Sequence, residues 1–139
     1  MPVIVGPSTI TINHNNRFVI AQPDASMAPG DDVGFFAQDT RFVSTYGIWI
    51  NGRAPLLLNA LRVEHFSARH EFTTPELPLG TGALGAGGLS LAARSVGLRL
   101  DRTISEGVHE DYDLVNYAPD AVRLVLEMRA TGSFEPLGI

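Results

Sequence analysis

Several acidic side chains could in principle supply acid–base chemistry, and their positions along the chain limit what they can do. Hydrolysis of a glycosidic bond needs two carboxyl groups held about 5–10 Å apart across that bond. The candidates for such a pair are Asp31, Asp32, Asp39, Glu64, Glu71, Glu106, Glu110, Asp111 and Asp113. Asp31 and Asp32 follow a Pro-Gly turn. Asp111 and Asp113 share the polar face of a predicted strand, so we predict no catalytic pair in this chain.

Histidines next to glutamates superficially indicate a metal site at His65 and His70, with His109 as a third candidate ligand. Positions 65 and 70 point to opposite faces of an extended strand. A shared zinc ion would therefore need a bulge between them. We interpret these histidines as ordinary strand residues and predict no metal site.

A glycine-rich stretch, Gly80–Gly85, matches the Gly-x-Gly-x-x-Gly pattern of dinucleotide-binding folds, with Asp101 at the spacing of a ribose-binding acid. That pattern binds a pyrophosphate only where a strand precedes it and a helix follows it. Here Pro75 and Pro78 precede it, and two glycines and an alternating pattern follow. We predict a hairpin loop and no bound cofactor.

Asp39 and Arg41 flank Thr40 and point the same way on an extended chain, where a guanidinium suits a carboxylate partner. In one interpretation they only tie a turn and adjacent strands together; in the other they face a partner domain or a sugar chain. Trp49, Tyr46 and Tyr117 offer flat apolar faces that either fill the core or contact sugar rings. Trp49 is out of phase with Ile48 and Ile50, which keeps the binding interpretation open.

The elements that must position these residues are strands, because apolar residues recur at every second position through much of the chain. The clearest strand is Val122–Ala130, and a second covers Gly107–Tyr117. The intervening Ala118–Ala121 carries turn residues, so we predict that these two strands form a hairpin.

We predict four further strands upstream, over Thr9–Asn13, Arg17–Gln22, Phe42–Asn51 and Leu56–Phe72. Turns are expected at Asn15-Asn16 and at Asn51-Gly52, the latter a good hairpin signal. A short helix over Ala60–Arg69 is the alternative for part of the last strand. The alternation slips by one residue near Ser95, which predicts a β-bulge. Many short strands with regular turns favour an all-β antiparallel sandwich.

Composition narrows the function classes. The 139 residues fit one domain over 1–139, and the chain has no cysteine. Ten basic residues against fifteen acidic ones give a formal charge of −5, without a basic stripe, so we expect neither nucleic-acid nor membrane-surface binding. No apolar run approaches the ~20 residues of a membrane span. The first residues have no basic, apolar leader, so we expect a cytoplasmic protein.

Two stretches resemble motifs of a known family. Gly34–Gly52 runs GFFAQDTRFVSTYGIWING, and Arg102–Glu110 (RTISEGVHE) continues to Leu114–Tyr117 (LVNY). Both closely resemble the N-terminal domain of bacterial and archaeal glycogen debranching enzymes, and the resemblance spans roughly residues 16 to 134. It implies a supersandwich-like β-sandwich that packs on a helical (α/α)₆ catalytic domain with amylo-α-1,6-glucosidase activity. It also implies that the family's β-domain continues beyond residue 139.

The resulting hypothesis is a non-catalytic β-domain that packs on the helical catalytic domain and helps to shape the polyglucan cleft. The alternative is a free-standing module that binds carbohydrate or protein. In either case the residues expected at an interface or on a carbohydrate are Asp39, Arg41, Tyr46, Trp49 and Asn51. Unpaired strand edges, Ala121–Ala130 and the N-terminal strand among them, predict homo-oligomers.

Overall fold

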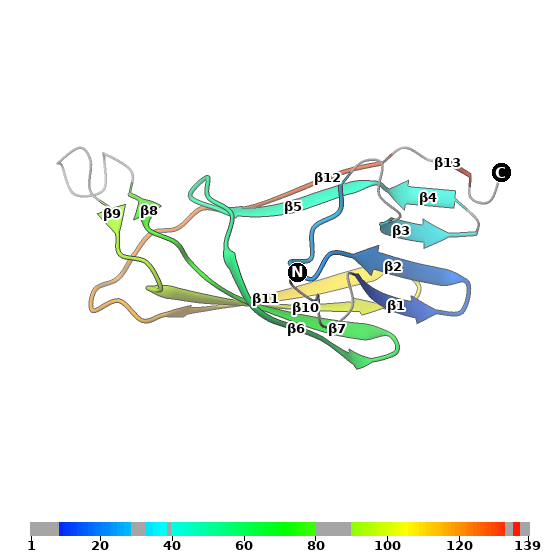
Figure 1. Ribbon diagram of the computed structural model, residues 1–139, viewed down its shortest axis with the longest axis horizontal. Coiled ribbons are helices and arrows are strands. Elements are labelled where there is room, and N and C mark those ends of the chain that lie inside the picture. Colours follow the sequence, from blue (N-terminus) through cyan, green and yellow to red (C-terminus); the bar gives the residue numbers. More distant parts are fainter. Residues whose placement is uncertain (1–8, 29–32, 39, 80–89, 133–134, 137–139) are drawn as a thin grey trace, which may run out of the picture.

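The computed structural model describes residues 9–28, 33–38, 40–79, 90–132 and 135–136, and this part of the chain contains strands and no helix (Figure 1). The strands are β1 Ile10–His14, β2 Arg17–Ala21, β3 Gly34–Ala37, β4 Thr40–Val43, β5 Thr45–Ile50, β6 Leu56–Glu64, β7 Ser67–Thr73, β8 Leu77–Pro78, β9 Ser90–Leu91, β10 Val96–Ile104, β11 Val108–Asn116, β12 Leu126–Thr131 and β13 Glu135–Pro136. None of the described residues belongs to a helix that could cross a membrane.

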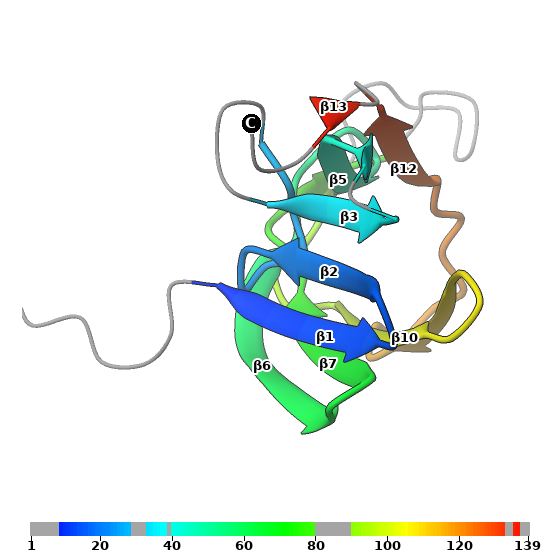
Figure 2. The ribbon, with the colours of Figure 1, turned by 90° about the vertical axis from the view of Figure 1, so that its right-hand side faces the viewer.

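All the strand pairs are antiparallel, and two layers face each other. One layer is the sheet β11-β10-β7-β6; the other combines the sheet β1-β2-β3-β4-β13 with the pair β12-β5 (Figures 1 and 2). The short pair β8-β9 lies at one end. The predicted all-β sandwich is confirmed.

The core lies between these layers in two clusters. One joins β1 and β2 to β7 and β10, for example Ile12 and Val19 against Ala68 and Ile104. The other joins β5 to β7 and β10 through the buried side chains Ala25, Ile48, Ile50, Phe72, Leu77, Leu98 and Leu100. Alternation produces this arrangement, because every second residue of β10 points inward and the residues between them face solvent or lie at its margin.

Both predicted tight turns are present. The β1–β2 hairpin turns at Asn15, whose φ of 55° is tolerated by asparagine. Asn51 and Gly52 have φ angles of 49° and 78°, and Ile50 and Arg53 exchange backbone hydrogen bonds across them. That pairing ends after a single bridge, because β6 crosses to the other layer.

The strand predicted over Leu56–Phe72 is two strands, β6 and β7, joined by a turn at His65 and Phe66. The region Ala60–Arg69 is therefore extended and not helical. Similarly, the predicted strand Phe42–Asn51 is divided between β4 and β5 at Ser44.

The predicted hairpin between Gly107–Tyr117 and Val122–Ala130 is wrong. β11 pairs with β10, and β12 begins only at Leu126 and pairs with β5 in the other layer. Asn116 bends the chain after β11, since its side chain accepts from Ala118 N and donates to Asp120 O. Asn51 then binds the segment before β12 through two hydrogen bonds. Its Oδ1 accepts from Val125 N at 2.8 Å, and its backbone N donates to Val125 O at 2.9 Å.

The predicted bulge at Ser95 is also wrong, because the change of phase is a turn between β9 and β10. Arg94 has φ 64°, and its N–H donates to Thr74 O. The Ser95 hydroxyl donates to Ala92 O at 2.6 Å. The glycine-rich stretch 80–85 lies outside the described residues, as do Asp31 and Asp32, but β8 and β9 on either side of the glycines pair antiparallel.

Candidate functional site

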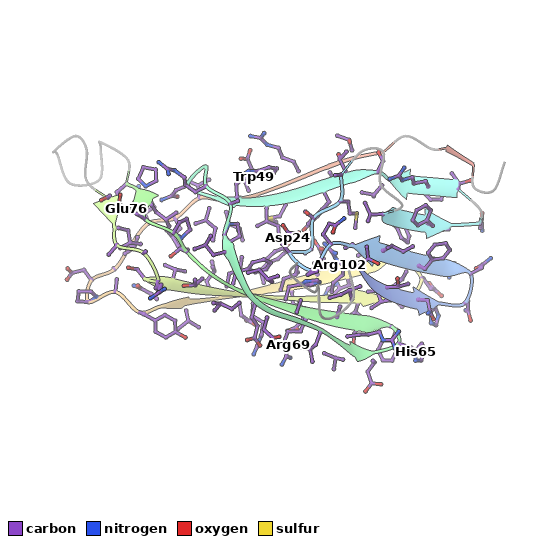
Figure 3. The ribbon with its side chains drawn as sticks, viewed as in Figure 1. Asp24, Trp49, His65, Arg69, Glu76 and Arg102 are labelled. Carbon is purple, nitrogen blue, oxygen red and sulfur yellow. The ribbon has the colours of Figure 1, made fainter. Side chains whose placement is uncertain are left out.

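A groove of about 450 Å³ lies beside β5, on the edge that β12 does not cover. Its lining residues come from the chain after β2, from β5, from the turn before β6, and from β7 and β12; they are Asp24, Ser26, Met27, Ala28, Thr45, Tyr46, Gly47, Ile48, Trp49, Ala54, Pro55, Phe72, Arg129 and Thr131. Ile48 and Ile50 are buried in the core, so the alternation of β5 places Trp49 on the opposite, outward face (Figure 3).

The Trp49 indole is held in a defined position. Its ring lies over Gly47, where a Cβ atom would come within 2.5 Å of the indole Cη2 atom. The guanidinium of Arg129 lies 5.0 Å from the ring centroid, a cation–π distance. Arg129 in turn is paired with Glu127 at 3.0 Å. The result is a flat aromatic surface fixed on a strand.

The backbone of β5 adds polar groups to the groove. Tyr46 exchanges two hydrogen bonds with Met27 on this edge, and Ile50 exchanges two with Arg53. Ile48 lies between them in the strand, so its N–H and C=O point to the same edge. Neither group takes part in the β5–β12 ladder or in the bonds to Met27 and Arg53. A donor and an acceptor therefore face the groove side by side.

The groove also carries side-chain oxygens. Asp24 Oδ1 accepts from Ser26 N at 3.0 Å and from the Ser26 hydroxyl at 2.6 Å, which fixes the loop that forms one wall. Thr45 and Thr131 share a hydroxyl–hydroxyl bond across the β5–β12 pair. Among the described lining residues only Asp24 has a carboxylate. The arrangement suits binding of a hydroxyl-rich ring, whereas hydrolysis of a glycosidic bond needs a second carboxyl group.

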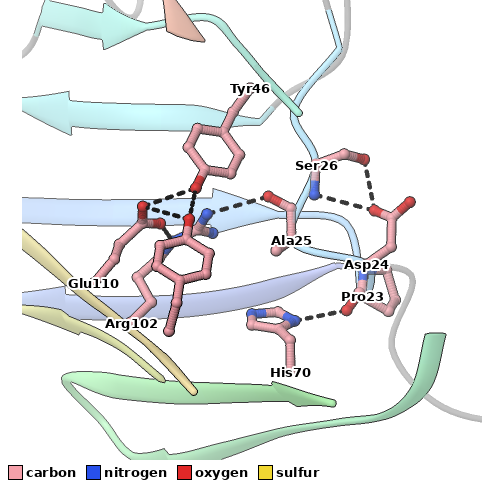
Figure 4. Close-up of polar contacts among 9 residues, drawn as sticks. Pro23, Asp24, Ala25, Ser26, Tyr46, His70, Arg102 and Glu110 are labelled. Carbon is pink, nitrogen blue, oxygen red and sulfur yellow. Dashed lines mark hydrogen bonds and ion pairs between the residues drawn. The ribbon is translucent and has the colours of Figure 1, made fainter. Parts of the chain in front are cut away.

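A buried polar network lies behind the groove, between the layers (Figure 4). Arg102 of β10 is 2% exposed and donates from Nε to Glu110 Oε2 at 2.8 Å and from Nη2 to Ala25 O at 3.3 Å. The Tyr46 hydroxyl donates to Glu110 Oε1 at 2.7 Å, and the Tyr112 hydroxyl donates to the same oxygen at 2.9 Å. The two hydroxyl groups also contact each other. The Arg102 guanidinium lies 4.8 Å from the centroid of the Tyr46 ring.

Burial changes the ionisation of this network. It raises the pKa of Tyr46 to about 12, with the nearby Glu110 charge acting in the same direction. Burial also raises the pKa of Tyr112, as does its hydrogen bond with Tyr46. His70, whose Nδ1 lies 2.6 Å from Pro23 O, has a lowered pKa because burial disfavours its charged form. The two phenols therefore remain protonated donors at neutral pH.

The residues predicted at the site do not form one cluster. Trp49 lines the groove, and Tyr46 lines it while its hydroxyl enters the buried network. Arg41 donates from Nε to Val33 O at 3.0 Å and lies 5.9 Å from the Phe36 ring centroid, so it ties β4 to the chain before β3. Asn51 forms the turn described above and donates to Pro78 O at 3.1 Å. Asp39 lies outside the described residues.

Sequence reasoning missed Arg102, Asp24 and Arg129. A signal for Arg102 was present, because it occupies the inward phase of β10 with Leu98 and Leu100. An arginine in a buried phase needs an inward-facing acid, and Glu110 is its direct cross-strand neighbour. No comparable signal was present for Asp24 or Arg129, whose positions depend on the pairing of β5.

The histidines considered as metal ligands are dispersed. His70 is buried, whereas His109 lies on the outer face of β11 and its Nε2 is 3.2 Å from Asp111 Oδ1. His65 is at the β6–β7 turn, where its ring packs edge-on against Phe66. Across the described ranges no three histidine or acidic side chains gather as they would around a metal ion.

Comparison with known proteins identifies the family. Residues 12–137 match the family model described as the N-terminal domain of (some) glycogen debranching enzymes. A search of curated proteins gave no significant match. The match covers nearly the whole chain, including β5, the groove and the buried network. The chain therefore belongs to the family of N-terminal domains found in some glycogen debranching enzymes.

Proposed function

We propose that this β-domain is the non-catalytic part of a glycogen-debranching glycosidase, and that it packs on a helical catalytic domain and shapes the cleft that receives the polyglucan. Family membership supports the association with debranching. The groove beside β5 is the observation that carries the substrate-contact role, because it presents Trp49, several hydroxyl side chains and the Ile48 backbone groups on one surface.

The composition of the groove favours binding over catalysis. An aromatic ring packs against the C–H face of a pyranose, while a neighbouring N–H and C=O can bond one sugar hydroxyl as acceptor and donor. Asp24, the one described carboxylate of the groove, is already occupied by Ser26. In this proposal the two carboxyl groups of the glycosidase reaction belong to the helical domain.

Strand β6 supports the packing role. It is an edge strand of nine residues, and its exposed apolar side chains are Leu56, Leu57, Leu58, Leu61 and Val63. A long apolar edge attracts other polypeptides. We propose that it meets the catalytic domain and that, in its absence, copies of the chain associate through their strand edges. Light scattering after size-exclusion chromatography that finds only monomer at high concentration would contradict the second statement.

Titration with maltooligosaccharides tests the substrate-contact role. Trp49 is the sole tryptophan of the chain, so its fluorescence and its indole N–H resonance report on the groove alone. Maltoheptaose is expected to perturb both signals, and Trp49→Ala is expected to abolish binding measured by calorimetry. Tyr117→Ala is the matched control, since Tyr117 is an exposed aromatic residue that does not line the groove. Equal binding by both variants would refute the role of the groove.

An activity assay tests the non-catalytic role. The purified chain is expected to show no turnover of α-1,6-linked glucans, and turnover that survives purification would overturn the proposal. The alternative is a free-standing binding module, which the groove allows because this chain alone forms it. Maltoheptaose affinity that is unchanged when the helical domain is added in trans would favour this alternative.

A further inference from the structure

His70 of β7 is buried and does not itself line the groove, but it is bonded to one of the groove's walls. Its side chain lies in the core, with the residue 1% exposed. Its Nδ1 atom is 2.6 Å from the backbone oxygen of Pro23, in the turn that follows β2 (Figure 4). That turn continues into Asp24 and Ser26, which line the groove. His70 therefore reaches from the core to a segment whose other side faces the groove.

The bond also determines which nitrogen of His70 carries the proton. Burial lowers the pKa of His70, and the charge of Arg102 acts in the same direction. The Pro23 bond and the charges of Asp24 and Glu110 act in the opposite direction but do not outweigh burial. The ring is therefore neutral at pH 7 and has one N–H group. Because a backbone oxygen can only accept, this N–H group is Nδ1–H.

The turn is positioned by side chains of the opposite layer. Its internal bonds, from Ala25 N to Gln22 O at 2.8 Å and from Gln22 N to Ser26 O at 2.9 Å, define its shape. Ala25 has φ 70°, a conformation that residues with a Cβ atom adopt where the surrounding structure imposes it. Two bonds join the turn to the facing sheet, the one from His70 at 2.6 Å and one from Arg102 to Ala25 O at 3.3 Å. His70 supplies the shorter of the two.

We propose that His70 is a positioning residue for the groove, and that its Nδ1–H group, through Pro23 O, holds the turn where Asp24 and Ser26 form a wall for the polyglucan. Only the polyglucan as ligand rests on the proposed function; the position of the turn does not. A side chain that merely filled the core would stabilise the fold without controlling affinity in the groove.

Two substitutions separate the donor of His70 from its volume. Leucine has no donor, whereas asparagine carries its Nδ2 donor two bonds beyond Cβ, as histidine carries Nδ1. In urea denaturation, His70→Leu is expected to be at least as stable as His70→Asn, because asparagine is smaller and buries an additional amide oxygen. The order of the affinities is expected to be the reverse.

Affinity for maltoheptaose is measured by Trp49 fluorescence with the 139-residue chain. His70→Leu is expected to bind about fivefold to tenfold more weakly than the parent, the equivalent of one hydrogen bond, and His70→Asn is expected to bind nearly as well as the parent. His65→Leu is the matched control, because His65 is exposed at the β6–β7 turn and does not line the groove. Its affinity is expected to equal that of the parent.

Two measurements without ligand test the same bond. The imidazole nitrogen shifts of His70 are expected to show a proton on Nδ1 at pH 7. The backbone amide resonances of Asp24, Ala25 and Ser26 are expected to move in His70→Leu and to return towards the parent positions in His70→Asn.

Three results would overturn the proposal. A proton on Nε2 of His70 in the parent would exclude donation to Pro23, whether or not the variants fold. Turn resonances that stay in place in His70→Leu would show that the turn does not depend on this bond. Affinities that follow the stabilities of the variants would leave His70 a core residue only. Failure of the proposed function is seen separately, as a parent chain that does not bind maltoheptaose, while the ligand-free measurements still decide the role of His70.

Discussion

Two arginine–carboxylate pairs in the same β10–β11 ladder lie on opposite faces of the sheet. Arg102 pairs with Glu110 and Arg99 with Asp113, each directly across the strands and each with a nitrogen–oxygen distance of 2.8 Å. The side chains of the first pair are 2% and 19% exposed, whereas those of the second are 46% and 57% exposed.

The comparison shows that burial, and not the nitrogen–oxygen distance, decides how much such a pair matters for the stability of the fold. On the outer face Arg99 also reaches Asp101 at 3.4 Å, and Asp101 bonds Arg69, so the charges form a solvated chain across three strands. Exposed pairs of this kind contribute little. On the inner face Arg102 has lost its water and Glu110 has lost most of it, so removing one partner leaves the charge of the other uncompensated.

The largest expected effect is that of Glu110→Gln. It leaves the Arg102 guanidinium buried without a counter-ion and should reduce the free energy of unfolding by about 3–5 kcal/mol, measured by urea denaturation. The double variant Arg102→Met/Glu110→Leu keeps the fold testable, because it removes both ions and should recover most of this loss. A Glu110→Gln cost no larger than that of Asp113→Asn would contradict the comparison.

An alkaline titration sharpens the same contrast. Burial raises the pKa of Tyr46 from an ordinary value of 10.0 to about 12, so the folded state holds this proton more tightly than the unfolded chain. The resulting stabilisation is complete below pH 10 and is lost as the pH rises from 10 towards 12. Tyr46→Phe is expected to remove this part of the decline in urea midpoints. Parallel declines in the variant and the parent would rule it out.

The smallest effect is expected for Asp113→Asn on the outer face. Its cost in free energy of unfolding should stay below about 1 kcal/mol, because both side chains remain hydrated. In 1 M NaCl the difference from the parent should shrink further, since exposed charges are screened. A larger cost that salt does not reduce would show that this pair is not an ordinary surface pair.

Local patterns predicted much of the fold. The turns at Asn15 and Asn51 and the alternation of β10 and β11 are encoded by neighbouring residues, and so they could be read directly. The strand that pairs with β12 could not be predicted in this way. Alternation fixes which side chains face the core, but it is the same for any partner strand, and the bonds between Asn51 and Val125 that select β5 join residues 74 apart.

For the candidate site too, local patterns could place only some of the residues. The phase of Trp49 relative to Ile48 placed it on the outward face of β5, as the structure shows. The role of Asn51 depends on Val125 and Pro78, and that of Arg41 on Val33, so neither followed from the local motif. Gly47 is similar: the need for a glycine is evident only once the indole lies over it.

The pairing of β5 with β12 also has a consequence for synthesis of the chain. Thr45 and Thr131 are 86 residues apart, so β5 leaves the ribosome long before its partner exists. At translation rates of roughly 5–20 residues per second, that interval is about 4–17 s. During this time the edge of β5 that later binds β12 is open to other nascent chains, which makes this edge a segment that a ribosome-associated chaperone would have reason to cover.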